Sequence, residues 1–157
     1  MELAHVTIDD IKKMDQAGLD KIYGEAEAGP IPDGDSNGIK IVFPESPAYE
    51  SSKQQEEMGI IWEGKLFSCP NPEGPGMLKN KVNGQLVFEA EAYYGTSDFD
   101  GGKCIILDYS KAPEYPTMRV RDEIRRVTDG LYLGRMNRVD EQGNIGEFLL
   151  NFVLDFN

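Results

Sequence analysis

Histidine is nearly absent from this sequence of 157 residues, since His5 is its one copy. Catalytic schemes that use histidine as a base, and metal sites built from several histidines, would therefore depend on a residue close to a chain end. Cysteine is also scarce. Cys69 and Cys104 form no C-x-x-C pair, which indicates two reduced structural thiols. Any chemistry is left to carboxylates, Tyr, Lys, Arg or Cys.

Long apolar runs are missing as well. No stretch reaches about 18 consecutive apolar residues, and the first ten residues, MELAHVTIDD, are polar and acidic. We therefore expect a cytoplasmic protein without a membrane partner. The net charge of −12 disfavours attraction to nucleic acid as well as to anionic lipid. The sequence contains neither a glycine-rich phosphate loop nor a metal-ligand cluster, so we expect no cofactor and no metal.

The composition is that of a globular protein, with 39% hydrophobic and 28% charged residues. Thr7 can cap a helix in which Ile8, Ile11, Leu19 and Ile22 recur at roughly helical spacing. We expect this helix and its lead-in to cover 7–28.

After this segment the hydrophobic period changes to that of strands. We predict strands near 38–43, 58–68, 76–82, 85–94, 103–110, 118–127, 130–139 and 147–156. Tight-turn signals separate several of them, above all Asn83-Gly84, which is typical of a two-residue hairpin. Short strands joined in this way form a meander, and a meander of about eight strands hides its edges best by closing.

The predicted fold is therefore all-β with one N-terminal helix: a lipocalin-like, up-and-down antiparallel β-barrel of about eight strands. One domain would span 1–157, with the barrel itself at 38–156. A barrel of this size is filled by side chains or holds one small ligand.

Every arginine of the chain lies between positions 119 and 138. The segment 118–127 can be read as a helix with Val120, Ile124 and Val127 on one stripe, or as a strand. As a strand, Arg121, Glu123 and Arg125 share one face, and Val120, Asp122 and Ile124 share the other. Because Asp129-Gly130 follows as a hairpin signal, we favour the strand.

Several short motifs resemble a known group. WEGKLF (62–67), LDYS (107–110), RDEIR (121–125), GLYLGRM (130–136) and FVL (152–154) occur in the order seen in small uncharacterised bacterial and fungal lipocalin-like proteins. These are remotely similar to the GXWXG-type domain family. The resemblance implies a lipocalin-like barrel and leaves the activity open.

The candidate site consists of polar residues on otherwise apolar strands. In 103–110 either Asp108 or Tyr109 must lie on the apolar face, and a buried carboxylate there would need an arginine partner. We predict Asp108, Glu123 and Tyr109 as catalytic candidates. The ligand-binding candidates are Trp62, Lys65, Tyr94, Arg121, Asp122 and Arg135. Gly64, beside the single tryptophan, indicates a bend or a close approach of two backbones.

Two functions remain open at this point. In the first, the barrel binds a small, partly apolar organic molecule and an inward cluster of Arg, carboxylate and Tyr residues runs acid/base chemistry of the lyase, isomerase or cyclase type. In the second, the protein is a non-catalytic binding or carrier protein, with the same cluster on its outer face as cross-strand ion pairs. For both functions we expect the protein to be a monomer or a homodimer.

Overall fold

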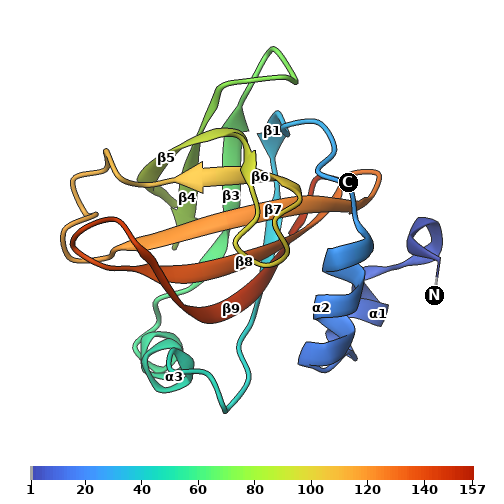
Figure 1. Cartoon of the computed structure of the whole chain (residues 1–157). Helices are drawn as coiled ribbons and strands as arrows, with labels where there is room; N and C mark the ends of the chain where they lie inside the picture. Colours follow the sequence, from blue (N-terminus) through green and yellow to red (C-terminus); the bar gives the residue numbers. More distant parts are fainter. Residues whose placement is uncertain (1) are drawn as a thin grey trace.

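The computed structural model describes residues 2–157, in which nine strands form one antiparallel sheet. The strands are β1 (Gly34–Asp35), β2 (Asn37–Ile41), β3 (Trp62–Ser68), β4 (Gly76–Val82), β5 (Gln85–Thr96), β6 (Lys103–Asp108), β7 (Val120–Thr128), β8 (Leu131–Val139) and β9 (Ile145–Asp155). From β3 to β9 each strand pairs with the next one along the chain. The result is the nearly closed, lipocalin-like barrel of Figure 1, which confirms the predicted fold class.

The barrel closes through the segment that contains β1 and β2. β1 pairs with β3, and β2 pairs with β9, so the two act as one strand interrupted at Ser36. The backbone N–H and the Oγ of Ser36 both donate to the Lys65 carbonyl, at 3.2 and 2.6 Å. Counted in this way, the barrel within residues 2–157 has the eight strands of an up-and-down meander.

Two glycines allow this closure. A Cβ on Gly64 would lie 2.5 Å from the Ser36 carbonyl oxygen, and a Cβ on Gly38 would lie 2.5 Å from the Trp62 ring. Gly64 also has φ +132° and sits at a register shift of β3 against β4. The expected close backbone approach at Gly64 is therefore confirmed.

The N-terminal segment forms two α-helices where one was predicted. A short 3₁₀ turn, η1 (Leu3–His5), precedes α1 (Ile8–Lys12) and α2 (Gln16–Glu25). Thr7 caps α1, and the Asp15 side chain accepts from the Gly18 N–H at 2.8 Å, which starts a second helix. Figure 1 shows both helices along the outer wall of the barrel, near the C-terminal strands.

One helix was not predicted. α3 (Tyr49–Glu57) has the sequence YESSKQQEE, which carries almost no apolar periodicity, and it crosses the end of the barrel drawn lowest in Figure 1. The predicted strand 58–68 therefore begins only at Trp62. The strand interpretation of 118–127 is confirmed by β7, which runs antiparallel to both β6 and β8.

Two hydrophobic clusters lie on opposite sides of the sheet. The interior cluster includes Leu78, Leu107, Ile124 and Phe152. The second lies between the outer wall and the N-terminal helices, where α2 buries Leu19, Ile22 and Tyr23. β7 takes part in both, because its residues alternate between the interior and the wall beneath α2.

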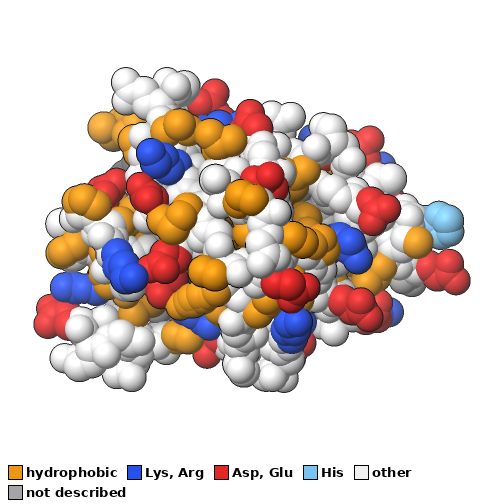
Figure 2. All heavy atoms as spheres, turned by 90° about the horizontal axis from the view of Figure 1, so that it is seen from above, with side chains coloured by type: hydrophobic (Ala, Val, Ile, Leu, Met, Phe, Trp, Pro, Cys, Tyr) orange, Lys and Arg blue, Asp and Glu red, His pale blue; other side chains and the backbone are white. Residues whose placement is uncertain are grey.

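On the face shown in Figure 2, acidic and basic side chains are interspersed with hydrophobic ones. Basic side chains therefore do not gather on this face into a patch of one sign. Among residues 2–157, no helix combines the length and the apolar character needed to span a membrane. Cys69 and Cys104 are both buried free thiols.

Candidate functional site

A cavity of about 640 Å³ opens into the barrel at the end where α3 lies. Its walls are mainly apolar, with Val120, Met136, Leu149, Leu150 and Phe152 contributed by β7, β8 and β9. Ser51, Ser52 and Gln55 of α3 line one side. The exposed lining residues, such as Ile60 and Met118, mark its mouth, whereas the buried ones mark its floor.

Four buried polar residues meet at this floor, and we call them the floor network: Lys65 of β3, Asn80 of β4, Tyr109 just after β6, and Asp122 of β7. Lys65 is only 3% exposed. Its Nζ donates to Asn80 Oδ1 at 2.7 Å and to the Tyr109 hydroxyl at 2.6 Å. The same nitrogen lies 3.2 Å from Asp122 Oδ2, which makes a buried ion pair.

The remaining polar atoms of the network are joined to one another with one exception. The Tyr109 hydroxyl donates to Asp122 Oδ2 at 3.0 Å and accepts from Asn80 Nδ2 at 3.1 Å. Asn80 Oδ1 also accepts from Trp62 Nε1 at 2.9 Å. The exception is Asp122 Oδ1, which is buried and has no hydrogen-bond partner among residues 2–157.

Burial shifts the proton affinities of these groups. It lowers the pKa of Lys65 from its ordinary value, because the ammonium loses its water. It raises the pKa of Asp122 for the corresponding reason, and the nearby Lys65 cation opposes that rise. The rings of Trp62, Tyr109 and Phe152 have centroids 5.0 to 5.4 Å from Lys65 Nζ, which favours the ammonium form.

Phe88 covers the network from β5. Lys79 pairs with Glu89 and Asn80 with Val87, so Phe88 is the extra residue of a β-bulge. Its φ of +52° is uncommon for a bulky residue. The Glu114 carboxylate accepts from the Phe88 N–H at 2.9 Å, and Asn80 Nδ2 donates to the Phe88 carbonyl at 3.0 Å. This bulge stacks the Phe88 ring on Tyr109, with centroids 4.2 Å apart.

Four of the nine predicted site residues meet at this cavity: Trp62, Lys65, Tyr109 and Asp122. Tyr94 lies at the other end of the barrel, where its hydroxyl donates to the Gly29 carbonyl at 2.6 Å. Asp108, Arg121, Glu123 and Arg135 lie on the outer wall. Of the two arrangements that the sequence left open, the inward cluster of the enzyme hypothesis is therefore wrong for these four residues, and the outer-face arrangement is the one found.

Two of these outer residues, Glu123 and Arg135, hold α2 against the barrel, and we call these two and their α2 partners, Tyr23 and Asp20, the wall clamp. Glu123 is 2% exposed and accepts from the Tyr23 hydroxyl at 2.7 Å, from the Asp98 N–H at 2.9 Å and from Ser97 Oγ. Arg135 Nη1 donates to Asp20 of α2 at 2.7 Å. Since both strands alternate, these side chains point outward while Asp122 and Met136 point inward.

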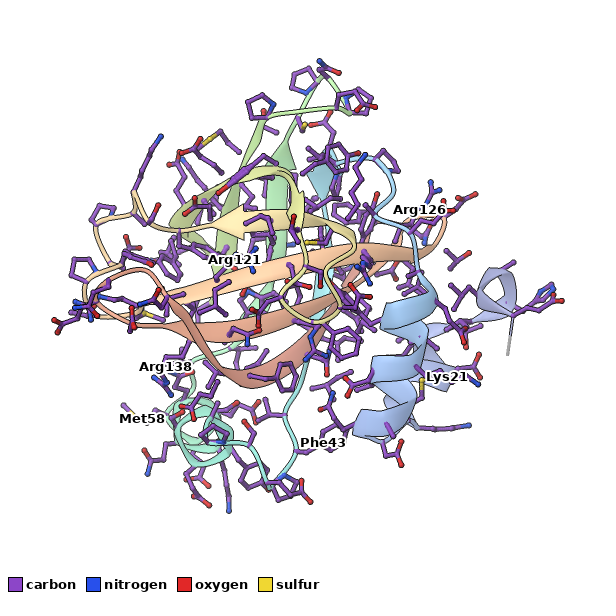
Figure 3. All side chains as sticks on the ribbon, viewed as in Figure 1. Lys21, Phe43, Met58, Arg121, Arg126 and Arg138 are labelled. Atoms are coloured by element: carbon purple, nitrogen blue, oxygen red, sulfur yellow. The ribbon has the colours of Figure 1, made fainter. Side chains whose placement is uncertain are left out.

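Arg125 and Asp100 extend the wall clamp to the loop after β5. Their side chains form two parallel hydrogen bonds of 2.6 and 2.7 Å, which is the strong bidentate arrangement. These bonds are the main reason that the pKa of Asp100 falls to about 2. Figure 3 shows Arg121 on the outside of β7, with Arg126 and Arg138 at opposite ends of the sheet. Asp108 is also on the wall and accepts from the Tyr93 hydroxyl at 2.6 Å.

Tyr23→Phe tests the wall clamp. We expect the variant to lose about 2 kcal/mol of unfolding free energy, because the buried Glu123 carboxylate loses a hydrogen bond. Tyr93→Phe is the matched control, since it removes the same kind of bond from the partly exposed Asp108, and we expect a loss of about 1 kcal/mol or less. Urea unfolding followed by circular dichroism measures both. Equal losses would contradict a structural role for the buried contact.

Asn80 and Phe88 belong to the site but were not among the predicted residues. Asn80 had a detectable signal, because it alternates in phase with Gly76, Leu78 and Val82 on β4 and is therefore a polar residue on an inward face. The bulge at Phe88 depends on the pairing of β4 with β5 and has no such signal. Among the described residues, no group of three or more His, Cys, Asp or Glu side chains is arranged to hold a metal ion.

No family model matches the chain, and no curated protein matches it in sequence. In structure it is similar to a protein from Thermomonospora curvata, with a TM-score of 0.61 and 19% sequence identity over 100% of this chain and 99% of that one. At this identity the likeness shows the fold alone. The resemblance to the GXWXG-type family stays a prediction.

Proposed function

We propose that the protein binds a small, largely apolar organic molecule inside the barrel, with a hydroxyl or N–H group of the molecule directed at Asp122. One observation carries the proposal: Asp122 Oδ1 is a buried acceptor at a cavity, and no group among residues 2–157 donates to it. A buried polar group left without a partner costs about 1–3 kcal/mol. A ligand donor would recover that free energy.

The walls support the same proposal. Side chains such as Val120, Leu150 and Phe152 offer apolar contact on several sides. The volume of about 640 Å³ lies within the range usual for small-molecule pockets. An apolar wall with a few convergent polar groups at one end selects a ligand by shape and orients it by its polar group. Binding alone makes the protein a carrier or binding protein of the calycin type.

Two rigid probes test this proposal. 2-Naphthol and naphthalene differ by one hydroxyl, and Trp62, the only tryptophan, lines the cavity and reports binding by its fluorescence. We expect 2-naphthol to bind about tenfold more tightly, because a hydrogen bond to a charged acceptor contributes about 1.5–3 kcal/mol. Asp122→Asn should remove most of this advantage and leave naphthalene binding unchanged. Equal affinity of the two probes for the unaltered protein would contradict the proposal.

Native mass spectrometry of the purified protein gives an independent test. An excess mass that is lost on denaturation would reveal a bound molecule and its size. Its fragmentation would then identify the donor group expected at Asp122. A bound molecule without any hydroxyl or N–H group would argue against the assigned orientation.

The floor network also favours a second candidate function, a cofactor-independent enzyme of the lyase, isomerase or cyclase type. Asp122, with a raised pKa and the Tyr109 hydroxyl beside it, has the character of a general acid or base. The test is deuterium incorporation into the molecule identified by mass spectrometry, incubated in D₂O. Exchange that needs Asp122 would indicate proton transfer, and its absence would leave binding as the function.

A further inference from the structure

We infer that the cavity has a second polar subsite at Arg119, so that the ligand is an organic anion with its acidic group at the mouth and its hydrogen-bond donor at the floor. The inference rests on the proposed binding function and adds the charge class of the ligand. Arg119 was not among the predicted site residues.

Arg119 differs from the other arginines in its partners. Five of them pair with carboxylates: Arg121 with Glu123, Arg125 with Asp100, Arg126 with Asp129, Arg135 with Asp20, and Arg138 with Glu147. The Arg119 guanidinium has neither an ion pair nor a hydrogen bond within residues 2–157, although the chain has 28 acidic residues and 16 basic ones. Arg119, which is partly buried and lines the cavity, is the exception among the arginines, because its guanidinium has no anion among residues 2–157.

The backbone holds Arg119 at the rim of the cavity. Its carbonyl accepts from the Val139 N–H at 2.9 Å, which ties the entry of β7 to the end of β8. Its neighbour Met118 is 49% exposed and Val120 lines the wall, so Arg119 stands between the solvent and the interior. Figure 3 shows Arg138, another rim residue, at this same end, near α3.

The other charges at the mouth are already engaged. Arg138 Nε donates to Glu147 at 2.8 Å, and Lys40 Nζ lies 3.8 Å from Glu56. The carboxylate of Glu114, which also lines the cavity, accepts a hydrogen bond from the Phe88 N–H. Arg119 is therefore the cation that an incoming anion would meet without displacing an existing partner. Arginine suits carboxylate, sulfonate and phosphate groups alike, because its donors form a planar fork.

The two subsites are separated along the chain, with Arg119 at the rim and Asp122 at the floor. Arg119 and Asp122 are three residues apart, which corresponds to about 10 Å of extended chain. A molecule that reaches both subsites therefore carries its anionic and donor groups at opposite ends of an apolar body, and two fused aromatic rings provide a rigid probe of this kind.

The test uses 6-hydroxy-2-naphthoate beside 2-naphthol, in isothermal titration calorimetry. We expect the hydroxynaphthoate to bind the unaltered protein about tenfold more tightly, because it adds a charge-assisted contact. Arg119→Gln should abolish this difference and leave the affinity for 2-naphthol unchanged. Arg138→Gln is the matched control at the same rim and should retain most of the difference, since Glu147 already occupies its guanidinium.

The outcomes separate the two ideas. The anion subsite is overturned if 2-naphthol and the hydroxynaphthoate bind with equal affinity. It is also overturned if Arg119→Gln still binds the hydroxynaphthoate more tightly than 2-naphthol. In both cases the proposed binding function stands. If Arg138→Gln removes the difference and Arg119→Gln does not, the anion site belongs to another residue. Absence of binding by both probes would overturn both proposals.

Discussion

Lys65→Met will lower the free energy of unfolding by about 3–5 kcal/mol, because it leaves the Asp122 carboxylate buried without a cation. Both side chains are almost fully buried, at 4% and 3% exposure. Removing one member of such a pair costs far more than the pair contributes, since the remaining charge has lost its water. Urea unfolding followed by circular dichroism gives the value, because this readout does not depend on Trp62.

A double-mutant cycle separates the charge from the packing. With Asp122→Asn in the same chain there is no isolated charge, so Lys65→Met/Asp122→Asn should lose clearly less than the sum of the single losses. Lys40→Met is the matched control, because Lys40 faces Glu56 in a partly exposed pair and should cost about 1 kcal/mol or less. Losses of equal size for Lys65 and Lys40 would mean that the floor network is held in a neutral form.

Gly64→Ala will destabilise the barrel by about 3 kcal/mol or more, since two unfavourable effects combine there. The new Cβ would meet the Ser36 carbonyl oxygen at 2.5 Å and the Gly38 nitrogen at 2.8 Å, and both are backbone atoms that cannot turn aside. The φ of +132° is also one that side chains with a Cβ rarely adopt. Thermal and urea unfolding measure the loss.

Gly34→Ala is the control for the backbone angle alone. Gly34 lies in β1 with φ +108°, and a Cβ there would have no atom within 4 Å. We expect this variant to lose about 1 kcal/mol. Should the two variants lose the same amount, the crossing of the closing segment over β3 would not be as tight as described. Because Lys65 follows Gly64, the Gly64 variant should also weaken 2-naphthol binding.

The closing crossing and the floor network thus depend on the same strand. Ser36 bonds to the Lys65 carbonyl, while the Lys65 side chain points into the network on the other side. The strand that completes the barrel therefore also positions the cation beside Asp122. The polar cluster can exist in an apolar interior because its buried side-chain nitrogen and oxygen atoms are hydrogen-bonded. Among the described residues, Asp122 Oδ1 is the one exception.

Local sequence patterns were sufficient to predict much of the fold. Period-two alternation and the turn signals predicted the strands of the meander, and Asn83-Gly84 marked the hairpin between β4 and β5, because these signals depend on neighbouring residues. The sequence did not predict α3, because this helix has no apolar stripe of its own. Its position depends on the barrel mouth, where its residues line the cavity. The break between α1 and α2 depended on one capping residue, Asp15.

The site shows the same division. Alternation on β7 by itself determined which side chains share a face: Arg121, Glu123 and Arg125 on one, and Val120, Asp122 and Ile124 on the other. It does not determine which of the two faces is inside the barrel, because the pattern is the same for both. The tertiary structure decided this, because α2 and the loop after β5 supply partners for the outer set, whereas Lys65 is available only within the barrel. The same long-range pairing left the guanidinium of Arg119 and one oxygen of Asp122 without partners in residues 2–157. Such unpaired groups depend on every neighbour in space, and so only the folded chain reveals them.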